Sequence, residues 1–526
     1  MIARVLILVS LVLVLGVPFA MQPARERDTA SADAPVVVIV TPHVEQIRSE
    51  FQRAFSAWHE RTYAEPVRIS WRTPGGTSDI VKLLQSEFGA NIKQGNIAAD
   101  GSCEPGTIGF DLMFGGGSFD HGRLARGVTT APEGVDPFNV PISVPAGFSQ
   151  AQLDEWYGEN RIGSEQLYHP EQYWLGTALS SFGIVYNRDV LARLGVAEPT
   201  SFKDLTDPRL AGWIALADPR QSGSITTTFD SILGNYGWNE GWRVLRAMTA
   251  NSRYFTNSST RPPIDVSQGE AAAGLAIDFY GRGQAQVIMR PGDTPETCRV
   301  DYADPKGAVY VDADPVSIIR GGPRPDLARR FVEFTLTEEA QSLWQFNAVG
   351  SEAGAENPLG PSGEAMGPVQ HELRRMPVRR VMYEKYLPYF VDKSDPFTLA
   401  SDTRNPGWRT GVQVMMGSFA IDVGPSQDDA WAAMRDADER LRAEMEPLFY
   451  AFPDPDRIAA LWEREFGRDG IELPADALLP FTEENYRAVR DTWRDGAVAK
   501  RLEIIYTLIF QEQYERVVTL ADIGGP

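Results

Sequence analysis

Residues 36–40, VVVIV, are the stretch that most constrains what this chain can fold into. Five consecutive β-branched residues predict a strand buried on both faces, which is typical of a parallel sheet covered by helices. Ile47, Phe51, Phe55 and Trp58 follow at helical spacing and predict an amphipathic helix lying on that sheet. The folded part of the chain therefore begins with a strand–helix unit of an α/β protein.

The same unit recurs twice, and each time a glycine-rich turn follows the strand. Residues 67–71 lead through TPGGTSD into a second helix, and residues 111–114 lead into GGGS and a third. Ligands of open α/β sheets lie at the carboxyl ends of strands, and helix N-termini bind anions or polar oxygens. The turns match neither the P-loop nor the dinucleotide fingerprint, so each is either a ligand contact or only a tight turn with a capping Ser or Thr. The candidate ligand residues are Gly76, Thr77, Ser78, Gly116 and Ser118.

A second half of the chain repeats this theme. Residues 173–186 read as a strand, and residues 213–217 form another that ends in DPRQSGS before a helix starting near Ile225. We expect Ser222, Gly223 and Ser224 to stand at the N-terminus of that helix, as a second half-site. The pattern predicts two α/β lobes with facing polar edges.

Residues 252–284 contain a hydroxyl-rich loop and an acid followed by two aromatic residues. The loop before Pro262 contains Ser258, Ser259 and Thr260, and we expect these residues to bind a ligand. Gly269 and Glu270 predict the start of an Ala-rich helix that runs to Asp278 and Tyr280 and ends at Gly281 and Gly283. The alternative is that Tyr280 is a core aromatic residue and residues 258–260 are a turn and cap.

Length and charge exclude several classes of protein. A chain of 526 residues holds two or three domains, and its net charge of −21 disfavours a nucleic-acid partner. Arg4 and the apolar run of residues 5–17 predict a signal peptide over residues 1–21, with an uncleaved anchor as the alternative. Residues 22–35 read as a flexible leader. We therefore expect a periplasmic or extracytoplasmic protein.

Only two cysteines are present, Cys103 and Cys298, each in a loop rich in Gly, Pro or Asp. In an exported protein an even number of cysteines allows a bridge, so we predict a Cys103–Cys298 disulfide. Neither residue lies in a CxxC motif or near a His, which disfavours a metal site built on them.

The last part of the sequence differs in composition. Residues 351–370 read as a linker rich in Gly, Pro and Glu, and residues 371–526 as a mostly helical extension. The extension opens with two arginine pairs, at residues 374–375 and 379–380. These arginines either contact a membrane or an anionic ligand, or lie on a solvated helix face, which is the interpretation we favour.

Taken together, these segments resemble the solute-binding proteins of ABC importers, in particular the ferric-iron group with its thiamine, polyamine and phosphonate relatives. The resemblance is carried by VIVTPH, GGTSDI, DLMFGGG, FGIVYNRDVLARLGV, the NSST loop, VSQGEAAAGLAIDFY and PVSIIRGGPRPDLARRFVEF, and covers roughly residues 36–344. It implies a type II, two-lobed periplasmic-binding fold that closes over a ligand by hinge motion. Lobe 1 then takes residues 36–180 and about 312–350, and lobe 2 takes residues 181–311.

The resemblance also implies a ligand set. In ferric-binding relatives, a helix led by Gly-Glu ends on two adjacent tyrosines that bind iron; here Phe279 and Tyr280 stand in their place. His43, Asp278 and Tyr280 would form a reduced Fe3+ site completed by an anion. The missing phenolate makes a phosphorus-containing or organic solute, held by hydroxyls and amides, an equal alternative.

The resemblance predicts a monomeric solute-binding component without catalytic residues, working with an ABC permease in the membrane. An alternative is a transferase or thiaminase-like enzyme on the same fold that uses Cys103 as nucleophile. Another is a ligand-sensing adaptor for a membrane receptor, for which the helical extension provides a docking surface.

Overall fold

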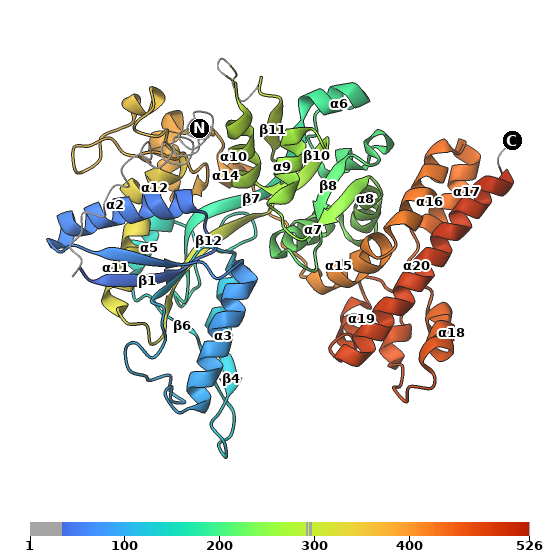
Figure 1. The fold of residues 1–526 in the computed structure, drawn as a ribbon, viewed down its shortest axis with the longest axis horizontal. Helices are drawn as coiled ribbons and strands as arrows, with labels where there is room; N and C mark the ends of the chain where they lie inside the picture. Colours follow the sequence, from blue (N-terminus) through green and yellow to red (C-terminus); the bar gives the residue numbers. More distant parts are fainter. Residues whose placement is uncertain (1–33, 291–292, 294–296, 525–526) are drawn as a thin grey trace, which may run out of the picture.

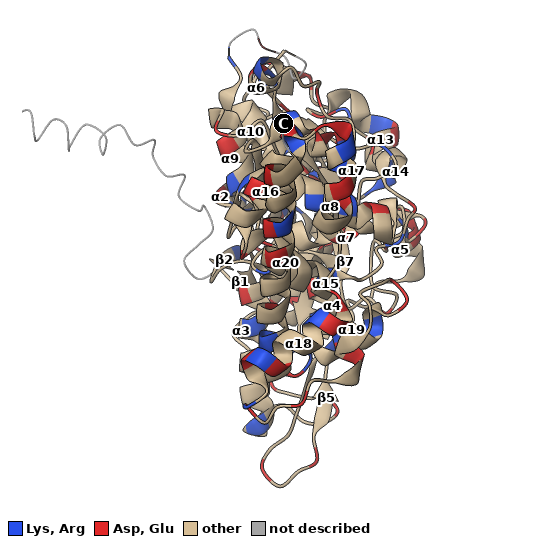
Figure 2. Ribbon diagram, turned by 90° about the vertical axis from the view of Figure 1, so that its right-hand side faces the viewer, with Lys and Arg blue, Asp and Glu red and all other residues tan. Residues whose placement is uncertain are grey.

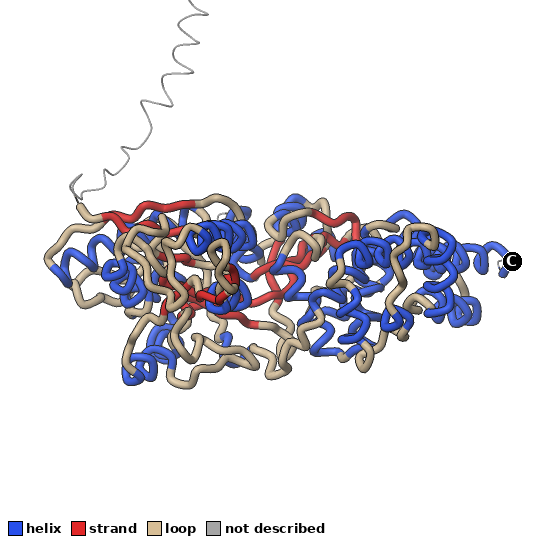
Figure 3. The backbone as a smooth tube through the Cα atoms, turned by 90° about the horizontal axis from the view of Figure 1, so that it is seen from below, coloured by secondary structure: helices blue, strands red, loops and turns tan. Residues whose placement is uncertain are grey.

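The computed structural model describes residues 34–290, 293 and 297–524, and shows three parts arranged along the long axis of the molecule (Figure 1). Two α/β lobes lie side by side and a helical part follows the second lobe, so strands occupy only part of the length (Figure 3). The predicted signal peptide and most of the leader lie outside the described residues. Within those residues, no helix combines the length and apolar character needed to cross a membrane.

The first lobe has a central sheet of strand order β2-β1-β3-β12-β7. β1 pairs in parallel with β2 and β3, whereas β12 is antiparallel to both β3 and β7. The strands are β1 (Val36–Val40), β2 (Arg68–Arg72), β3 (Leu112–Phe114), β6 (Ser143–Val144), β7 (Leu175–Asn187) and β12 (Val311–Ile319), with β4 (Val128–Thr130) and β5 (Phe138–Val140) in a separate ribbon. The run of β-branched residues is thus a strand inside the sheet.

Helices cover both faces of this sheet, which is why polar and apolar residues do not alternate along β1. One face packs on Phe51, Phe55 and Phe331 from α2 and α11, and the other on Leu84 and Phe88 from α3. The helices are α2 (Glu45–Tyr63), α3 (Thr77–Lys93), α4 (Ser118–Arg126), α5 (Gln150–Tyr157), α11 (Pro325–Thr335) and α12 (Glu338–Gln345). The aromatic side chains at these positions each bury a large apolar area in the core.

The second lobe continues the sheet in the order β7-β10-β8-β9. Its strands are β8 (Ile214–Ala217), β9 (Ser252–Thr256), β10 (Ala273–Ile277) and β11 (Val300–Ala303). Its helices are α6 (Arg188–Leu194), α7 (Gly223–Tyr236), α8 (Trp238–Ala250), α9 (Arg261–Gln268) and α10 (Asp278–Ile288). The polar turn after β8 therefore leads directly into α7, as the sequence indicates.

Long strands connect the lobes. β7 pairs with β12 through Ser181 and with β10 from Phe182 onward, so the chain passes from one lobe to the other within a single strand. β12 runs back beside it, with an irregularity in register between Asp314 and Pro315. Two adjacent antiparallel strands at this position are a natural hinge between two rigid lobes.

The helix predicted from Gly269 to Tyr280 is wrong. Ala273–Ile277 forms β10, and the helix begins only at Asp278. β10 lies between β7 and β8 and is buried along most of its length, so tertiary pairing overrides the helical propensity of its alanines. Gly281 does not end the helix; it lies inside α10, where a Cβ would stand 2.4 Å from the Tyr302 ring.

The extension begins as a segment packed over the hinge. β13 (Met376–Pro377) adds to β7, and α13 (Arg380–Tyr386) and α14 (Pro396–Leu399) follow. Arg374, Arg375 and Arg379 are only 5–6% exposed, so the solvated helix face favoured from the sequence is wrong for these three residues. Each guanidinium makes hydrogen bonds inside the protein, which is how a buried arginine is tolerated.

The remaining helices pack on the second lobe and share its core. Trp242 and Leu245 of α8 belong to the same apolar cluster as Phe419, Trp431 and many other residues of the extension. The helices are α15 (Arg409–Met416), α16 (Gly424–Asp436), α17 (Glu439–Phe449), α18 (Pro455–Phe466), α19 (Tyr486–Thr492) and α20 (Gly496–Gly524). Acidic and basic residues both occur along the ribbons of α16, α18 and α20 (Figure 2).

Candidate ligand-binding cleft

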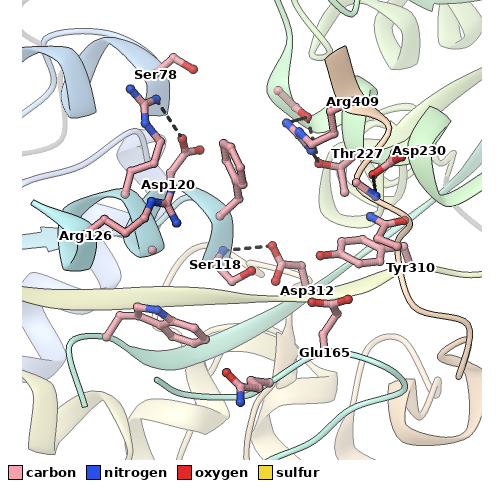
Figure 4. A pocket seen from close by; sticks show the side chains of 18 of the residues that line it. Ser78, Ser118, Asp120, Arg126, Glu165, Thr227, Asp230, Tyr310, Asp312 and Arg409 are labelled. Atoms are coloured by element: carbon pink, nitrogen blue, oxygen red, sulfur yellow. Dashed lines mark hydrogen bonds and ion pairs between the residues drawn. The ribbon is translucent and has the colours of Figure 1, made fainter. Parts of the chain in front are cut away.

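A cavity of about 1200 Å³ lies where the two lobes and the extension meet. Figure 4 shows Ser118, Asp120 and Arg126 on one side, facing Thr227, Asp230 and Arg409 on the other, with Asp312 and Glu165 between them. Its lining comes from α3 and α4, from residues 164–174, from α7, from β12 and from residues 404–413. This volume exceeds what a single metal ion needs and suits a small organic molecule.

The first-lobe wall is formed by α4 and the start of α3, which follow the glycine turns after β3 and β2. Gly115 and Gly116 have φ angles of +96° and +118°. A Cβ on Gly115 would lie 2.4 Å from His43 Nε2, and one on Gly116 would lie 2.6 Å from Thr77 Cγ2. Only glycine therefore allows this close approach of the two turns. Ser78 and Ser118 line the cavity, while Gly76 is the N-cap of α3.

The backbone N–H groups of the second turn already have acceptors within the protein. Gly116 N–H donates to Asp314 Oδ1 at 2.7 Å, and Ser118 N–H donates to Asp312 Oδ2 at 3.1 Å. The start of α4, which the sequence presents as an anion site, is thus occupied by the protein's own carboxyl groups. Burial raises the pKa of Asp312 to about 7, with the neighbouring Glu165 adding to the effect.

The second-lobe wall is the first half of α7. Ser222 caps this helix by accepting from Ile225 N–H, and Gly223, Thr227 and Asp230 line the cavity. Ser222 is 6% exposed and neither it nor Ser224 lines the cavity. Burial raises the pKa of Asp230 to about 6, although the N–H groups of Trp408 and Gly407 donate to its carboxylate.

The third wall is a turn and helix of the extension, which sequence reasoning missed. Arg409, the first residue of α15, donates to Gly223 O at 3.1 Å and to Thr227 Oγ1. Its guanidinium also lies 4.8 Å from the centre of the Phe119 ring on α4. The motif RNPGWRTG at residues 404–411 was the available signal, because it has the same form of polar turn before a helix as the other two walls.

The predicted metal ligands lie outside the cleft lining and around an arginine. Arg375 pairs with Asp314 and donates to Ser180 Oγ at 2.7 Å, and His43 Nε2 lies 2.9 Å from its Nη1. Burial raises the pKa of Asp278 and of Tyr280, and the positive charge of Arg375 opposes this shift at both groups. In the described ranges, no group of three His, Cys, Asp or Glu side chains is placed to hold a metal. A guanidinium thus stands among the residues that the resemblance assigned to Fe3+.

Asp278 is fully buried, and neither carboxyl oxygen has a hydrogen-bond partner within the described structure. Burial raises its pKa to about 7, with Arg282 opposing and Asp304 reinforcing the shift. Arg282 donates instead to Asp304 at 2.5 Å, and Arg374 joins the group by donating to Arg282 O at 2.6 Å. These contacts tie the hinge segment to α10 of the second lobe.

The hydroxyl loop of the second lobe closes on itself. Ser258 Oγ lies 2.9 Å from Thr260 Oγ1, and Thr256 Oγ1 donates to Ser258 O at 2.8 Å. The loop follows β9, the edge strand of the sheet, and Ser258, Ser259 and Thr260 do not line the cavity. Thr260 is the N-cap of α9 (Arg261–Gln268) but makes no side-chain capping hydrogen bond, and a ligand contact of these residues stays a prediction.

The predicted disulfide is wrong: Cys103 and Cys298 are free thiols. Cys103 packs against the α3 side of the first lobe, whereas Cys298 is buried in the second lobe with its thiol 3.7 Å from Ala285 O. The two loops belong to different lobes, so the thiols do not meet. Burial raises the pKa of Cys103, which disfavours its use as a thiolate nucleophile.

Residues 146–365 match the family model of the bacterial extracellular solute-binding proteins. An uncharacterized protein of Haemophilus influenzae is 30% identical over 165 residues, which is 31% of this chain and 44% of the relative. The phosphoglycerate transport regulatory protein PgtC of Salmonella typhimurium is 22% identical over 274 residues, 50% of this chain and 66% of the relative. The chain thus spans less than two thirds of the length of these relatives.

Among solved structures, the periplasmic binding protein AfuA of Actinobacillus pleuropneumoniae, with fructose-6-phosphate bound, is similar at 19% identity. The match covers 59% of this chain and 81% of AfuA, with a TM-score of 0.42.

Proposed function

We propose that this chain, whose residues 146–365 match the family model of the bacterial extracellular solute-binding proteins, captures a small organic anion for an ABC importer. The ligand occupies the cavity between α4, α7 and α15, and a permease in the membrane receives it. The observation that carries this proposal is that arginines without a carboxylate in ion-pair contact, among the described residues, line a cavity in which as many carboxyl groups as arginines are found. An unpaired guanidinium inside a concave site attracts an anionic solute.

The balance of charges in the cavity supports an anion. Arg123 pairs with Asp120 at 3.8 Å, and Arg220 pairs with Asp218 and Asp422. The three other arginines of the lining have no carboxylate partner in the described part of the chain: Arg126, Arg404 and Arg409. Burial raises the pKa of Asp312 to about 7, so this carboxyl group is only partly ionised near neutral pH, whereas Asp230, with a pKa of about 6, is mostly ionised.

Two further observations favour an organic anion over Fe3+. The name of the relative PgtC refers to the transport of phosphoglycerate, which is a small phosphorylated carboxylate. Arg375 stands among His43, Asp278 and Tyr280, and its positive charge opposes a ferric ion there. An anion with two charged groups would instead match arginines on both sides of the cleft.

A second candidate is an amine, because Glu165 lies close enough to Asp230 and Asp312 to raise the pKa of both. Titration calorimetry at fixed ionic strength separates the candidates, with 3-phosphoglycerate, putrescine and ferric citrate as ligands. We expect saturable binding of 3-phosphoglycerate at micromolar concentration or below, and weakening by at least about tenfold in Arg126→Gln. The matched control is Arg440→Gln, since Arg440 is exposed on the far extension. Binding of only putrescine or only ferric citrate would refute the anion proposal.

A further inference from the structure

We propose that the C-terminal extension is part of the ligand site and that Arg409 binds the anionic group of the solute. This inference rests on the proposed function, and adds to it a ligand residue from outside the two lobes. The extension then determines which solutes the protein accepts, besides packing on the second lobe.

The turn that carries Arg409 is held rigidly on the second lobe. Asp230 accepts from Gly407 N–H at 3.2 Å and from Trp408 N–H at 2.8 Å. The Trp408 ring packs edge to face against the Trp238 ring, with 4.8 Å between the ring centres. A side chain at the first position of α15 therefore starts from a fixed backbone, which lowers the entropic cost of holding it toward a ligand.

From that position the Arg409 guanidinium contacts the walls formed by the two lobes. It donates to Gly223 O and Thr227 Oγ1 on α7, and it lies over the ring of Phe119 on α4. Phe119 is 51% exposed. Contact with Arg409 covers part of this ring, so one residue of the extension touches both lobes across the cavity.

The remaining hydrogen-bonding capacity of Arg409 points to an acceptor from outside. A guanidinium has five N–H groups, and the two hydrogen bonds to α7 leave further donors available. Among the described residues its hydrogen-bond partners are a hydroxyl and a carbonyl, and its charge acts on Asp120 and Asp230, whose pKa values it lowers, without an ion-pair contact to either. A phosphate or carboxylate that enters beside Gly223 would also meet the positive end of α7. A bidentate contact with Arg409 is the geometry such groups favour.

The test uses the full chain and 3-phosphoglycerate as the probe, titrated by calorimetry into wild type, Arg409→Gln, Arg409→Lys and Arg440→Gln. We expect a loss of at least about tenfold in affinity for Arg409→Gln, a smaller loss for Arg409→Lys, and none for Arg440→Gln. Urea unfolding of each variant shows whether the extension remains folded, and Arg409→Lys keeps the test valid if the Gln variant unfolds.

The two proposals fail in different ways. Wild-type affinity in both Arg409 variants would overturn the role of Arg409 and leave the organic-anion function intact. Absence of 3-phosphoglycerate binding in wild type, with putrescine or ferric citrate bound, would overturn the anion function and the role of Arg409 together.

Discussion

Arg375 and Asp314 form an ion pair inside the hinge, with side chains that are 6% and 1% exposed. Arg375 comes from the segment that follows the two lobes, whereas Asp314 lies on β12 at the irregularity between the lobes. Burial alone would raise the pKa of Asp314, but Arg375 and His43 hold it below its ordinary value. The segment that leads to the extension is thus locked to the strand that connects the lobes.

Breaking the ion pair between Arg375 and Asp314 should lower the stability of the protein. Arg375→Gln leaves Asp314 buried without its counter-charge, and we expect the free energy of unfolding to fall by about 3–5 kcal/mol. Asp314→Asn should cost a similar amount, while the double variant should lose clearly less than the sum of the two. Urea unfolding of the four proteins measures this coupling, and additive losses would show that the two charges do not stabilise each other.

The carboxyl group of Asp278 should make stability depend on pH. Its folded pKa of about 7 lies above the ordinary value of 3.8, so the folded state binds the proton more tightly. The stability linked to this group therefore falls as pH rises between these two values, and the deficit is complete above about pH 7. Asp278→Asn removes the deficit, and we expect it to be more stable than wild type by about 1–3 kcal/mol at pH 8.

The same comparison at lower pH supplies the control for Asp278. The advantage of the Asn variant should shrink as the pH falls from 7 toward 3.8 and vanish only below that value, where wild-type Asp278 is protonated in both states. Thermal unfolding at four pH values measures it. An advantage that stays constant with pH would show that the pKa of Asp278 is the same in the folded and unfolded states.

The extension should be needed for the stability of the second lobe. Trp431 is buried, donates to Asn251 Oδ1 at 2.8 Å and packs against Phe449. We expect Trp431→Ala to lower the free energy of unfolding by about 3–5 kcal/mol, as other large-to-small core substitutions do. Arg440→Ala, at an exposed position of the same extension, should change it by less than about 0.5 kcal/mol. Two separate unfolding transitions would contradict a core shared by the lobe and the extension.

The thiols provide a direct check of the lobe assignment. Cys298 is 1% exposed and Cys103 is partly exposed, and both are free. We expect a thiol reagent to react with one group per chain in native, unreduced protein and with two after denaturation. Cys103→Ser should abolish the native reaction. Two unreactive cysteines in denatured, unreduced protein would restore the disulfide that the structure contradicts.

The fold followed from local patterns, and the parts that were missed depend on tertiary contacts. The run at residues 36–40 and the polar turn before α7 are local signals, and both elements form as expected. The helix predicted across residues 273–277 failed because two neighbouring strands recruit that segment into the sheet. The arginines at 374 and 375 resemble a surface charge run, and only their distant partners Asp392 and Asp314 show that they are buried.

The cleft could be predicted only in part for the same reason. Ser78, Ser118 and Gly223 stand at strand ends, where sheet topology places ligands, and all three line the cavity. Whether they contact a solute stays a prediction. Arg409 lies more than 180 positions after Gly223 in the sequence, and no local pattern indicates that α15 folds back against α7.

Native mass spectrometry and metal analysis of the protein as purified test the central claim most directly. An organic anion held in the cavity predicts a small added mass that is released on denaturation, with iron well below one atom per chain. Stoichiometric iron, with a visible absorption band that Tyr280→Phe abolishes, would contradict the organic-anion account. It would place the ligand among His43, Asp278 and Tyr280 instead.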